Sequence, residues 1–206
     1  MKIDPSEHAH SDNYKILTSV VAPRPIAWIT SLDSAGVVNL APFSFFNAVS
    51  GKPIYLAVSV GLRDDGQRKD TAVNIEQLGE FVVHLVTEEL LGAMNISAAD
   101  FPPDQSEIVA ADLHTMPSEK VRVPRLSEAQ VALECKLAQS LPLGNNTLFI
   151  GEVVMFHVAD RLLGPRFHVD GFAPIGRLGW PSVYCRTTDR FELPRVSYTK
   201  LVKPAP

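Results

Sequence analysis

Glycine and proline recur along the whole chain, and this punctuation limits the length of the helices and strands that it can form. The 206 residues include 12 Gly and 16 Pro. Proline fixes φ and removes a backbone donor, and glycine favours turns, so breaks this frequent exclude a bundle of long helices. We therefore expect a single domain over residues 1–206, built from many short elements that are mostly strands.

Charge and hydropathy exclude several classes of protein. With 46% hydrophobic residues and a net charge of -4, the chain is neither disordered nor basic enough for a general nucleic-acid binder. The N-terminus has no apolar run typical of a secretory signal, and polar residues interrupt the longest uncharged stretch, residues 34–51. Cys135 and Cys185 form no metal or redox motif and are expected to be reduced. These features predict a cytoplasmic protein with no membrane and no nucleic-acid partner.

Short runs of β-branched and aromatic residues predict strands, and two helices are expected between them, over residues 70–78 and 88–98. Because strands and helices do not alternate regularly, the pattern favours an antiparallel barrel over a doubly wound parallel sheet. Around this barrel we expect a polar N-terminal arm, a surface excursion over 101–126 and a C-terminal extension over 161–206. The expected strands are residues 26–31, 37–41, 53–60, 81–86, 129–139 and 148–160, with a loop over 42–51.

A cationic segment stands at the start of the first predicted helix. The preceding residues, Gly61 to Arg68, have the glycine spacing of a phosphate-binding P-loop but lack its Lys and its Ser or Thr. The next positions place two cations and a hydroxyl beside the free backbone amides of a helix start, a combination that binds a phosphate monoester. The alternative is a solvated basic loop with an ordinary helix cap. The segment consists of Arg68, Lys69, Asp70 and Thr71.

A second segment, Asn39 to Asn47, combines amides, a hydroxyl and three phenylalanines within nine positions. A flat aromatic heterocycle is bound by such a mixture of apolar surface and polar edges. The alternative is a core strand followed by a turn. The chain contains no sequence motif for a nucleophile, a paired carboxylate or a metal, so we predict no catalytic side chain and no metal site.

Taken together, three segments resemble the flavin reductase-like family, whose longer branch includes flavoredoxin-like proteins. The resemblance extends over roughly residues 14 to 160 and implies a mainly β fold with inserted helices, a six-stranded antiparallel, Greek-key FMN-binding split barrel. It also implies a homodimer with flavin near the subunit interface. The segments are Pro23-Arg24-Pro25-Ile26-Ala27-Trp28-Ile29-Thr30-Ser31, Asn39 to Asn47, and Arg68-Lys69-Asp70-Thr71 with Asn74.

The resemblance assigns roles to individual residues of this chain. Thr30 and Ser31 are implied to approach the flavin ring or ribityl chain, and Arg68 to Thr71 the phosphate. The segment Arg177 to Trp180, followed by Tyr184, is similar to an Arg-Leu-Gly-Gly and Tyr pattern of the family, with Trp180 in place of the second Gly. The residues implied to line the isoalloxazine are Ala41, Pro42, Phe43, Ser44, Phe46 and Asn47.

One departure from the family pattern bears on the reaction. Shorter NAD(P)H:flavin reductases often carry Gly-Asp-His before the last barrel strand, with the His near the nicotinamide, whereas this chain has Asn145-Asn146-Thr147. The first hypothesis is therefore an FMN-binding oxidoreductase that takes hydride from NADH or NADPH, with FAD as an alternative flavin substrate. Its FMN is either held tightly or released in reduced form to a partner oxygenase. The second is a flavoredoxin-like FMN electron carrier reduced by a protein partner. The third is a cofactor-less β-barrel binding module.

Overall fold

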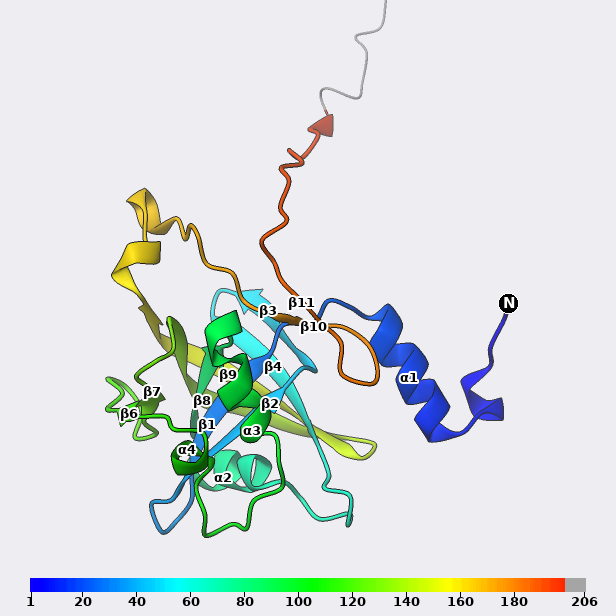
Figure 1. The fold of residues 1–206 in the computed structure, drawn as a ribbon, viewed down its shortest axis with the longest axis horizontal. Coiled ribbons are helices and arrows are strands. Elements are labelled where there is room, and N and C mark those ends of the chain that lie inside the picture. The colour runs from blue at the N-terminus through cyan, green and yellow to red at the C-terminus, as the bar shows by residue number, and fades with distance from the viewer. Residues whose placement is uncertain (199–206) are drawn as a thin grey trace, which may run out of the picture.

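In the computed structural model, which describes residues 1–198, one seven-stranded antiparallel sheet forms the centre of the molecule (Figure 1). Its strand order is β2-β1-β5-β8-β9-β4-β3. Two small two-stranded sheets, β6-β7 and β10-β11, lie outside it. The main strands are β1 (Ala27–Leu32), β2 (Val38–Phe43), β3 (Phe46–Gly51), β4 (Ile54–Gly61), β5 (Glu80–Leu85), β8 (Val131–Leu143) and β9 (Asn146–Val158); the short ones are β6 (Thr115–Met116), β7 (Arg125–Leu126), β10 (Gly176–Arg177) and β11 (Tyr184–Cys185).

The two edge strands of this sheet, β2 and β3, are joined through only Ser44 and Phe45. The carbonyl of Phe45 accepts a 2.8 Å hydrogen bond from the amide of Ser59, so this link stays attached to β4. Because the two edge strands are joined by so short a link, the sheet must curl until its two edges approach each other. This confirms the prediction of a mainly β, partly closed antiparallel barrel. The expected loop over 42–51 is wrong, because residues 46–51 pair with β4 as a seventh strand.

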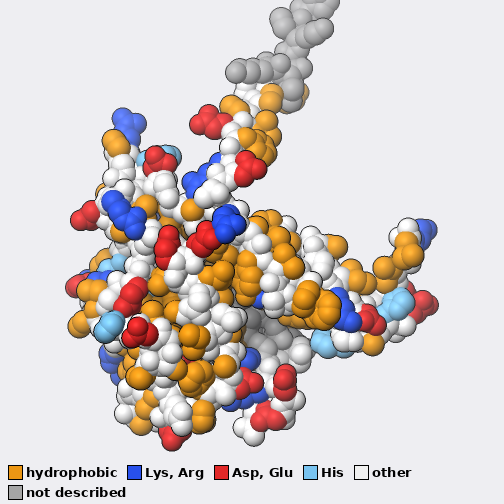
Figure 2. Space-filling view, viewed as in Figure 1, with side chains coloured by type: hydrophobic (Ala, Val, Ile, Leu, Met, Phe, Trp, Pro, Cys, Tyr) orange, Lys and Arg blue, Asp and Glu red, His pale blue; other side chains and the backbone are white. Residues whose placement is uncertain are grey.

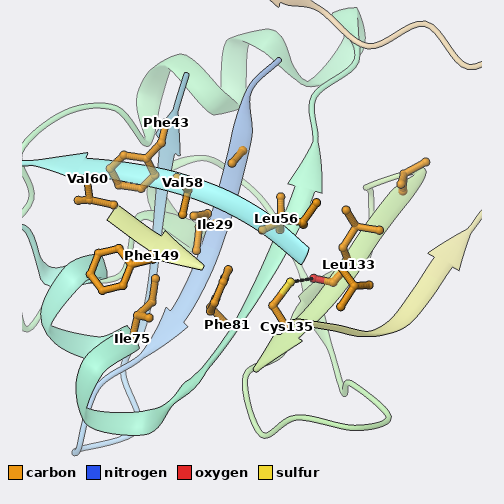
Figure 3. Close-up of a cluster of buried hydrophobic side chains, with 14 of the residues drawn as sticks. Ile29, Phe43, Leu56, Val58, Val60, Ile75, Phe81, Leu133, Cys135 and Phe149 are labelled. Atoms are coloured by element: carbon orange, nitrogen blue, oxygen red, sulfur yellow. Dashed lines mark hydrogen bonds between the residues drawn. The ribbon is translucent and has the colours of Figure 1, made fainter. Parts of the chain in front are cut away.

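The inside of the curled sheet holds the main hydrophobic core (Figure 3). Side chains of β1, β4, β5, β8 and β9 meet there, and helix α2 (Asp70–Leu78) closes it with Ile75. Alternate residues of β4 are buried, as expected of a strand with one face inward. Phe81, Phe149 and Ile75 are at most 1% exposed and lie at the centre of this core.

The observed helices match the sequence prediction at one place in the chain and differ from it at two others. Helix α2 covers the predicted residues 70–78, and Gly79 ends it with a φ of 73°, the left-handed conformation that glycine adopts most easily. The expected helix over 88–98 is a 3-10 turn followed by the short α3 (Leu91–Ile96). The expected polar arm contains helix α1 (His10–Val20), which projects from the body in Figure 1.

The free edge of β2 is covered by side chains rather than by another strand. Helix α4 (Glu107–Ala110) starts beside it, and the carboxylate of Glu107 accepts a 2.8 Å hydrogen bond from the amide of Leu40. The hydroxyl of Ser106 donates to the carbonyl of Val38. These two edge groups of β2 are thereby satisfied, and Ser106 and Glu107 are held against the strand.

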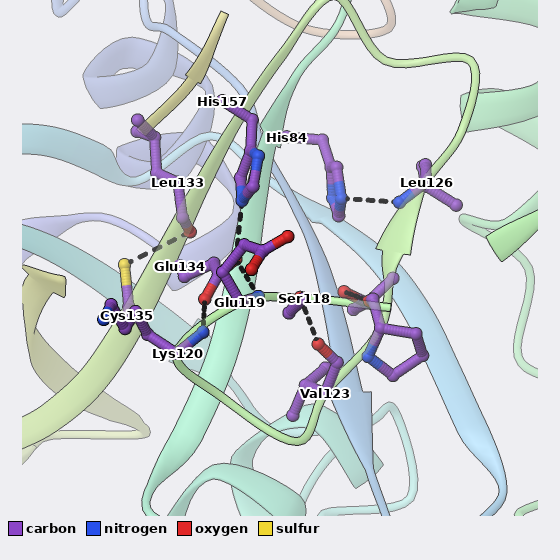
Figure 4. A network of polar contacts seen from close by, with 12 residues as sticks. His84, Ser118, Glu119, Lys120, Val123, Leu126, Leu133, Glu134, Cys135 and His157 are labelled. Atoms are coloured by element: carbon purple, nitrogen blue, oxygen red, sulfur yellow. Dashed lines mark hydrogen bonds and ion pairs between the residues drawn. The ribbon is translucent and has the colours of Figure 1, made fainter. Parts of the chain in front are cut away.

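Polar side chains on the outer face of the sheet fasten residues 118–126, which form the end of the predicted surface excursion (Figure 4). The buried carboxylate of Glu134 accepts the amides of Glu119 and Lys120 at 2.7 and 2.6 Å. Nε2 of His84 accepts the amide of Leu126 at 2.9 Å, so His84 is neutral and its Nδ1 faces the Trp28 carbonyl. Burial lowers the pKa of His84 to about 4.

Within residues 1–198, no helix is both long and apolar enough to cross a membrane.

Candidate functional site

A small cavity of about 140 Å³ lies where β2, the start of α2 and residues 97–101 meet. One wall is the aromatic segment singled out in the sequence, and another is the cationic segment, so the fold brings these two together. Because they come from a sheet edge and a helix start, both backbone groups and side chains face the space. The cavity is lined by Asn39, Ala41, Pro42, Phe43, Gly61, Arg63, Lys69, Asp70, Thr71, Ser97, Ala98, Ala99, Asp100, Phe101 and Glu107.

The charged groups of the cavity are paired with one another. Lys69, the N-cap residue of α2, has an extended backbone, and its ammonium lies 3.6 Å from the carboxylate of Asp100. The guanidinium of Arg63 forms a short ion pair with Asp70, in the first turn of the same helix. Two cations thus stand beside the positive end of a helix dipole, the environment that favours a bound anion.

Neutral polar side chains lie behind these charges. Nδ2 of Asn39 donates to Oγ1 of Thr71 at 2.8 Å and to Oγ of Ser31 at 3.4 Å. Oγ of Ser31 also accepts from Nδ2 of Asn74 at 3.2 Å. Asn39 and Thr71 therefore line the cavity in fixed positions, while Ser31 supports them from the strand behind.

Glu107 is a carboxylate at the inner end of the same cavity and is 5% exposed. Burial raises the pKa of Glu107, and the amide of Leu40, which donates to its carboxylate, opposes that effect. The nearby charge of Asp70 raises the pKa further.

A much larger groove, of about 1080 Å³, lies between helix α1 and the barrel. Figure 2 shows the arm that carries α1 standing out from the body, with hydrophobic side chains along it. Four aromatic residues line the groove, among them Tyr14 and Phe45, whose ring centroids are 6.2 Å apart. The groove and the small cavity share Pro42, Phe43, Gly61 and Lys69, so the two spaces adjoin.

Two segments from later in the chain complete the groove. Asn145 and Asn146 enter it from the turn between β8 and β9, and Nδ2 of Asn146 donates to Oγ of Ser59 at 2.9 Å. Trp180 enters from the C-terminal side, 58% exposed, with Lys15 of α1 over its ring at 5.4 Å. Trp180 therefore lies at the mouth of the groove.

The structure brings seven of the twelve sequence-predicted site residues to these two adjoining spaces. Ala41, Pro42, Phe43, Lys69, Asp70 and Thr71 line the cavity, and Ser44 lines the groove.

The other five predicted residues lie outside the lining. Ser31 is behind it, and the hydroxyl of Thr30 donates to the carbonyl of Pro124 at 2.8 Å on the outer side of the sheet. Phe46 packs against the main core, and the amide oxygen of Asn47 accepts from the backbone of Ala48. The guanidinium of Arg68 lies 2.8 Å from Glu76 on α2.

Sequence reasoning missed several residues that line the cavity. Asn39 belonged to the aromatic segment and Arg63 to the glycine-bounded loop, so each had a local signal. Residues 97–101 and Glu107 had none, because they reach the cavity only through long-range contacts such as Ser97 with Trp28 and Glu107 with Leu40.

Sequence relatives match nearly the whole chain. The model of the flavin reductase like domain family matches residues 20–188. An uncharacterized protein of Halalkalibacterium halodurans is 40% identical over 202 residues, which are 95% of this chain and 96% of that protein. YwrF, an uncharacterized protein of Bacillus subtilis, is 40% identical over 195 residues, which are 90% of this chain and 94% of that protein.

Solved structures with the same fold include a monooxygenase component, a nitroreductase and a flavoredoxin. Nitrilotriacetate monooxygenase component B from Bacillus cereus matches with a TM-score of 0.89 and 41% identity, covering 94% of this chain and 98% of that one. The 2-nitrobenzoate 2-nitroreductase of Pseudomonas fluorescens matches with a TM-score of 0.88 and 35% identity, covering 96% and 98%. Flavoredoxin of Desulfovibrio vulgaris has a TM-score of 0.75 at 19% identity, covering 87% and 94%, which supports the fold alone.

Proposed function

The chain belongs to the flavin reductase-like family, and we propose that it is an oxidoreductase that binds FMN and reduces it with NADH or NADPH. The observation that carries this proposal is that the cavity and the groove adjoin at Pro42, Phe43, Gly61 and Lys69. A cation-bearing helix start thereby lies beside an aromatic-lined space. A ligand with an anionic end and a flat ring matches both parts at once.

The residues present fit such a ligand. Lys69, Thr71 and the backbone amides at the start of α2 would hold the phosphate, and Pro42, Phe43 and Ser44 would face the ring. Bound flavin supplies the electron chemistry. The protein then needs to orient donor and acceptor and to exclude water, which agrees with the sequence prediction of no catalytic side chain.

The partners follow from the same assignment. Bacillus cereus nitrilotriacetate monooxygenase component B is by its name one component of an oxygenase, which supports delivery of reduced FMN or FAD to a separate oxygenase. The exposed apolar side chains of Leu17, Val20 and Val21, on and just after α1, support association with a second copy as a homodimer. We place the protein in the cytoplasm.

The test is the oxidation of NADH and of NADPH by purified protein in the presence of FMN, FAD or riboflavin, followed by nicotinamide absorbance. Turnover above the protein-free rate with at least one flavin supports the proposal. Flavin binding without any turnover contradicts it, and a protein that binds no flavin at all favours a cofactor-less binding module.

A second candidate function is a flavoredoxin-like electron carrier that a protein partner reduces. One observation favours it: Asn145-Asn146-Thr147 replaces the Gly-Asp-His that carries the nicotinamide His in shorter flavin reductases, and Asn146 lines the groove with its side chain bonded to Ser59. A yellow protein that dithionite reduces and NAD(P)H does not would select this function.

A further inference from the structure

Arg24 lies in the Pro-Arg-Pro segment of the sequence and has no role in the site described so far. It is 7% exposed, yet its guanidinium makes four hydrogen bonds and lies 5.9 Å from the centre of the Phe45 ring. Nη1 donates to the carbonyls of Thr18 at 2.5 Å and Val21 at 2.6 Å, and Nη2 donates to the carbonyl of Leu178 at 2.6 Å. Nε lies 3.5 Å from Oγ of Ser44.

These acceptors belong to three segments that form different walls of the large groove. Thr18 is in helix α1 and Val21 directly follows it, Ser44 lies between β2 and β3, and Leu178 is two residues before Trp180. Each segment contributes side chains to the groove. The backbone of Arg24 adds two further 2.8 Å hydrogen bonds with Arg177. One residue therefore joins all three walls.

Few other contacts attach helix α1 to the barrel. Thr18 is the helix's only buried residue in the described structure, so apolar packing contributes little to its attachment. Further contacts are Tyr14 near Phe45, Lys15 over Trp180, and Gly179, where an added Cβ would lie 2.5 Å from Oγ of Ser19. An isolated helix of 11 residues has only marginal stability in water. The hydrogen bonds from the Arg24 cation to the last carbonyls of α1 therefore contribute substantially to keeping the helix folded and attached to the barrel.

The contacts of Arg24 are made to neutral groups. Among the described ion pairs, none joins this guanidinium to a carboxylate. Burial lowers the pKa of Arg24, and the nearby charge of Arg177 lowers it further. A buried cation bonded only to carbonyls and a hydroxyl contributes little net stability and is better explained by the positions that it enforces.

We propose that Arg24 is the positioning residue of the flavin groove, which holds helix α1, the Ser44 turn and the Leu178 to Trp180 segment in place around the ring. This inference rests on the proposed function, because it takes the occupant of the groove to be the flavin. Arg24 itself does not line the groove and acts through these three walls.

The test compares Arg24→Met, which keeps the apolar stem and removes every donor, with Arg186→Met, which changes an exposed arginine paired with Glu88. Arg24→Met should weaken FMN and riboflavin by the same factor, about tenfold or more, because the groove rather than the phosphate site is altered. Trypsin should cut faster after Lys15, in the released helix. Arg186→Met should match the wild type in both measurements.

The outcomes separate this inference from the proposed function. A wild type that binds neither flavin refutes the proposed function, and the cleavage rate after Lys15 still reports whether Arg24 holds the helix. Unchanged flavin affinity and unchanged cleavage in folded Arg24→Met overturn the inference. If that variant does not fold, Arg24→Lys replaces it, because one ammonium cannot reach three segments; weaker flavin binding supports the inference and wild-type behaviour overturns it.

Discussion

The ammonium of Lys69 lies 3.6 Å from the carboxylate of Asp100, across the small cavity. Both side chains are partly exposed, so this ion pair is weak and a bound phosphate would compete for the same cation. Asp100→Asn should therefore strengthen FMN binding about two- to fivefold, corresponding to roughly 0.4–1 kcal/mol. Fluorescence titration measures the effect. Riboflavin, which has no phosphate, serves as the control and should bind unchanged; an equal gain for riboflavin would point to a general change of the cavity.

The neighbouring cations Lys69 and Arg68 should differ in their effect on FMN. Lys69→Ala removes a cavity-lining cation and should weaken FMN by about 1.5–3 kcal/mol, the range for hydrogen bonds to charged groups. Arg68→Ala removes a side chain that pairs with Glu76 instead, and its effect should stay within about 0.5 kcal/mol. Isothermal titration of both variants with FMN measures the two losses of binding free energy. A larger loss in Arg68→Ala would show that ligand binding rearranges the Glu76 pair.

The buried His84 should make stability depend on pH. Its folded-state pKa of about 4 lies below the ordinary value of 6.5, so the unfolded chain binds a proton that the folded chain does not. The free energy of unfolding is then highest above pH 6.5 and falls as the pH drops, by about 2 kcal/mol between pH 7 and pH 5. Urea unfolding over this range measures the slope. His84→Gln should flatten it, whereas His168→Gln, at an exposed site, should keep it.

Gly151 in β9 should not tolerate a larger side chain. An added Cβ would lie 2.4 Å from Cζ of Phe81 and 3.3 Å from Cβ of Cys135, both in the main core. Gly151→Ala should lower the free energy of unfolding by about 1–3 kcal/mol through overpacking. Gly51→Ala, in the edge strand β3 with no atom within 4 Å of the new Cβ, is the matched control. Similar losses in both variants would attribute the effect to strand propensity and not to packing.

The elements that were predicted correctly carry strong local signals. Helix α2 has an apolar stripe that ends at Gly79, and β4 has alternating burial within an apolar run. Strand β3 was missed because it is an edge strand with mostly exposed residues, which leaves no apolar alternation to detect. Helix α1 was missed because its N-cap, Ala9, offers no capping side chain and its apolar residues are exposed.

The candidate site was only partly predictable for a different reason. The aromatic and cationic segments were found because each concentrates its signal within a few positions. Which cation faces the cavity depends on where Asp70 and Glu76 lie, and this placed Arg63 at the cavity and Arg68 away from it. The wall formed by residues 97–101 depends on long-range packing, for example the 2.8 Å hydrogen bond from the Trp28 indole to Ser97.

The covering of the β2 edge has a consequence for how copies of this protein can meet. Ser106 and Glu107 occupy the carbonyl of Val38 and the amide of Leu40, which a foreign strand would need to continue the sheet. Strand addition at this edge, the common route to domain swapping and amyloid-like growth, would first require α4 to detach. Self-association through β2 is therefore blocked for as long as the cavity wall stays folded.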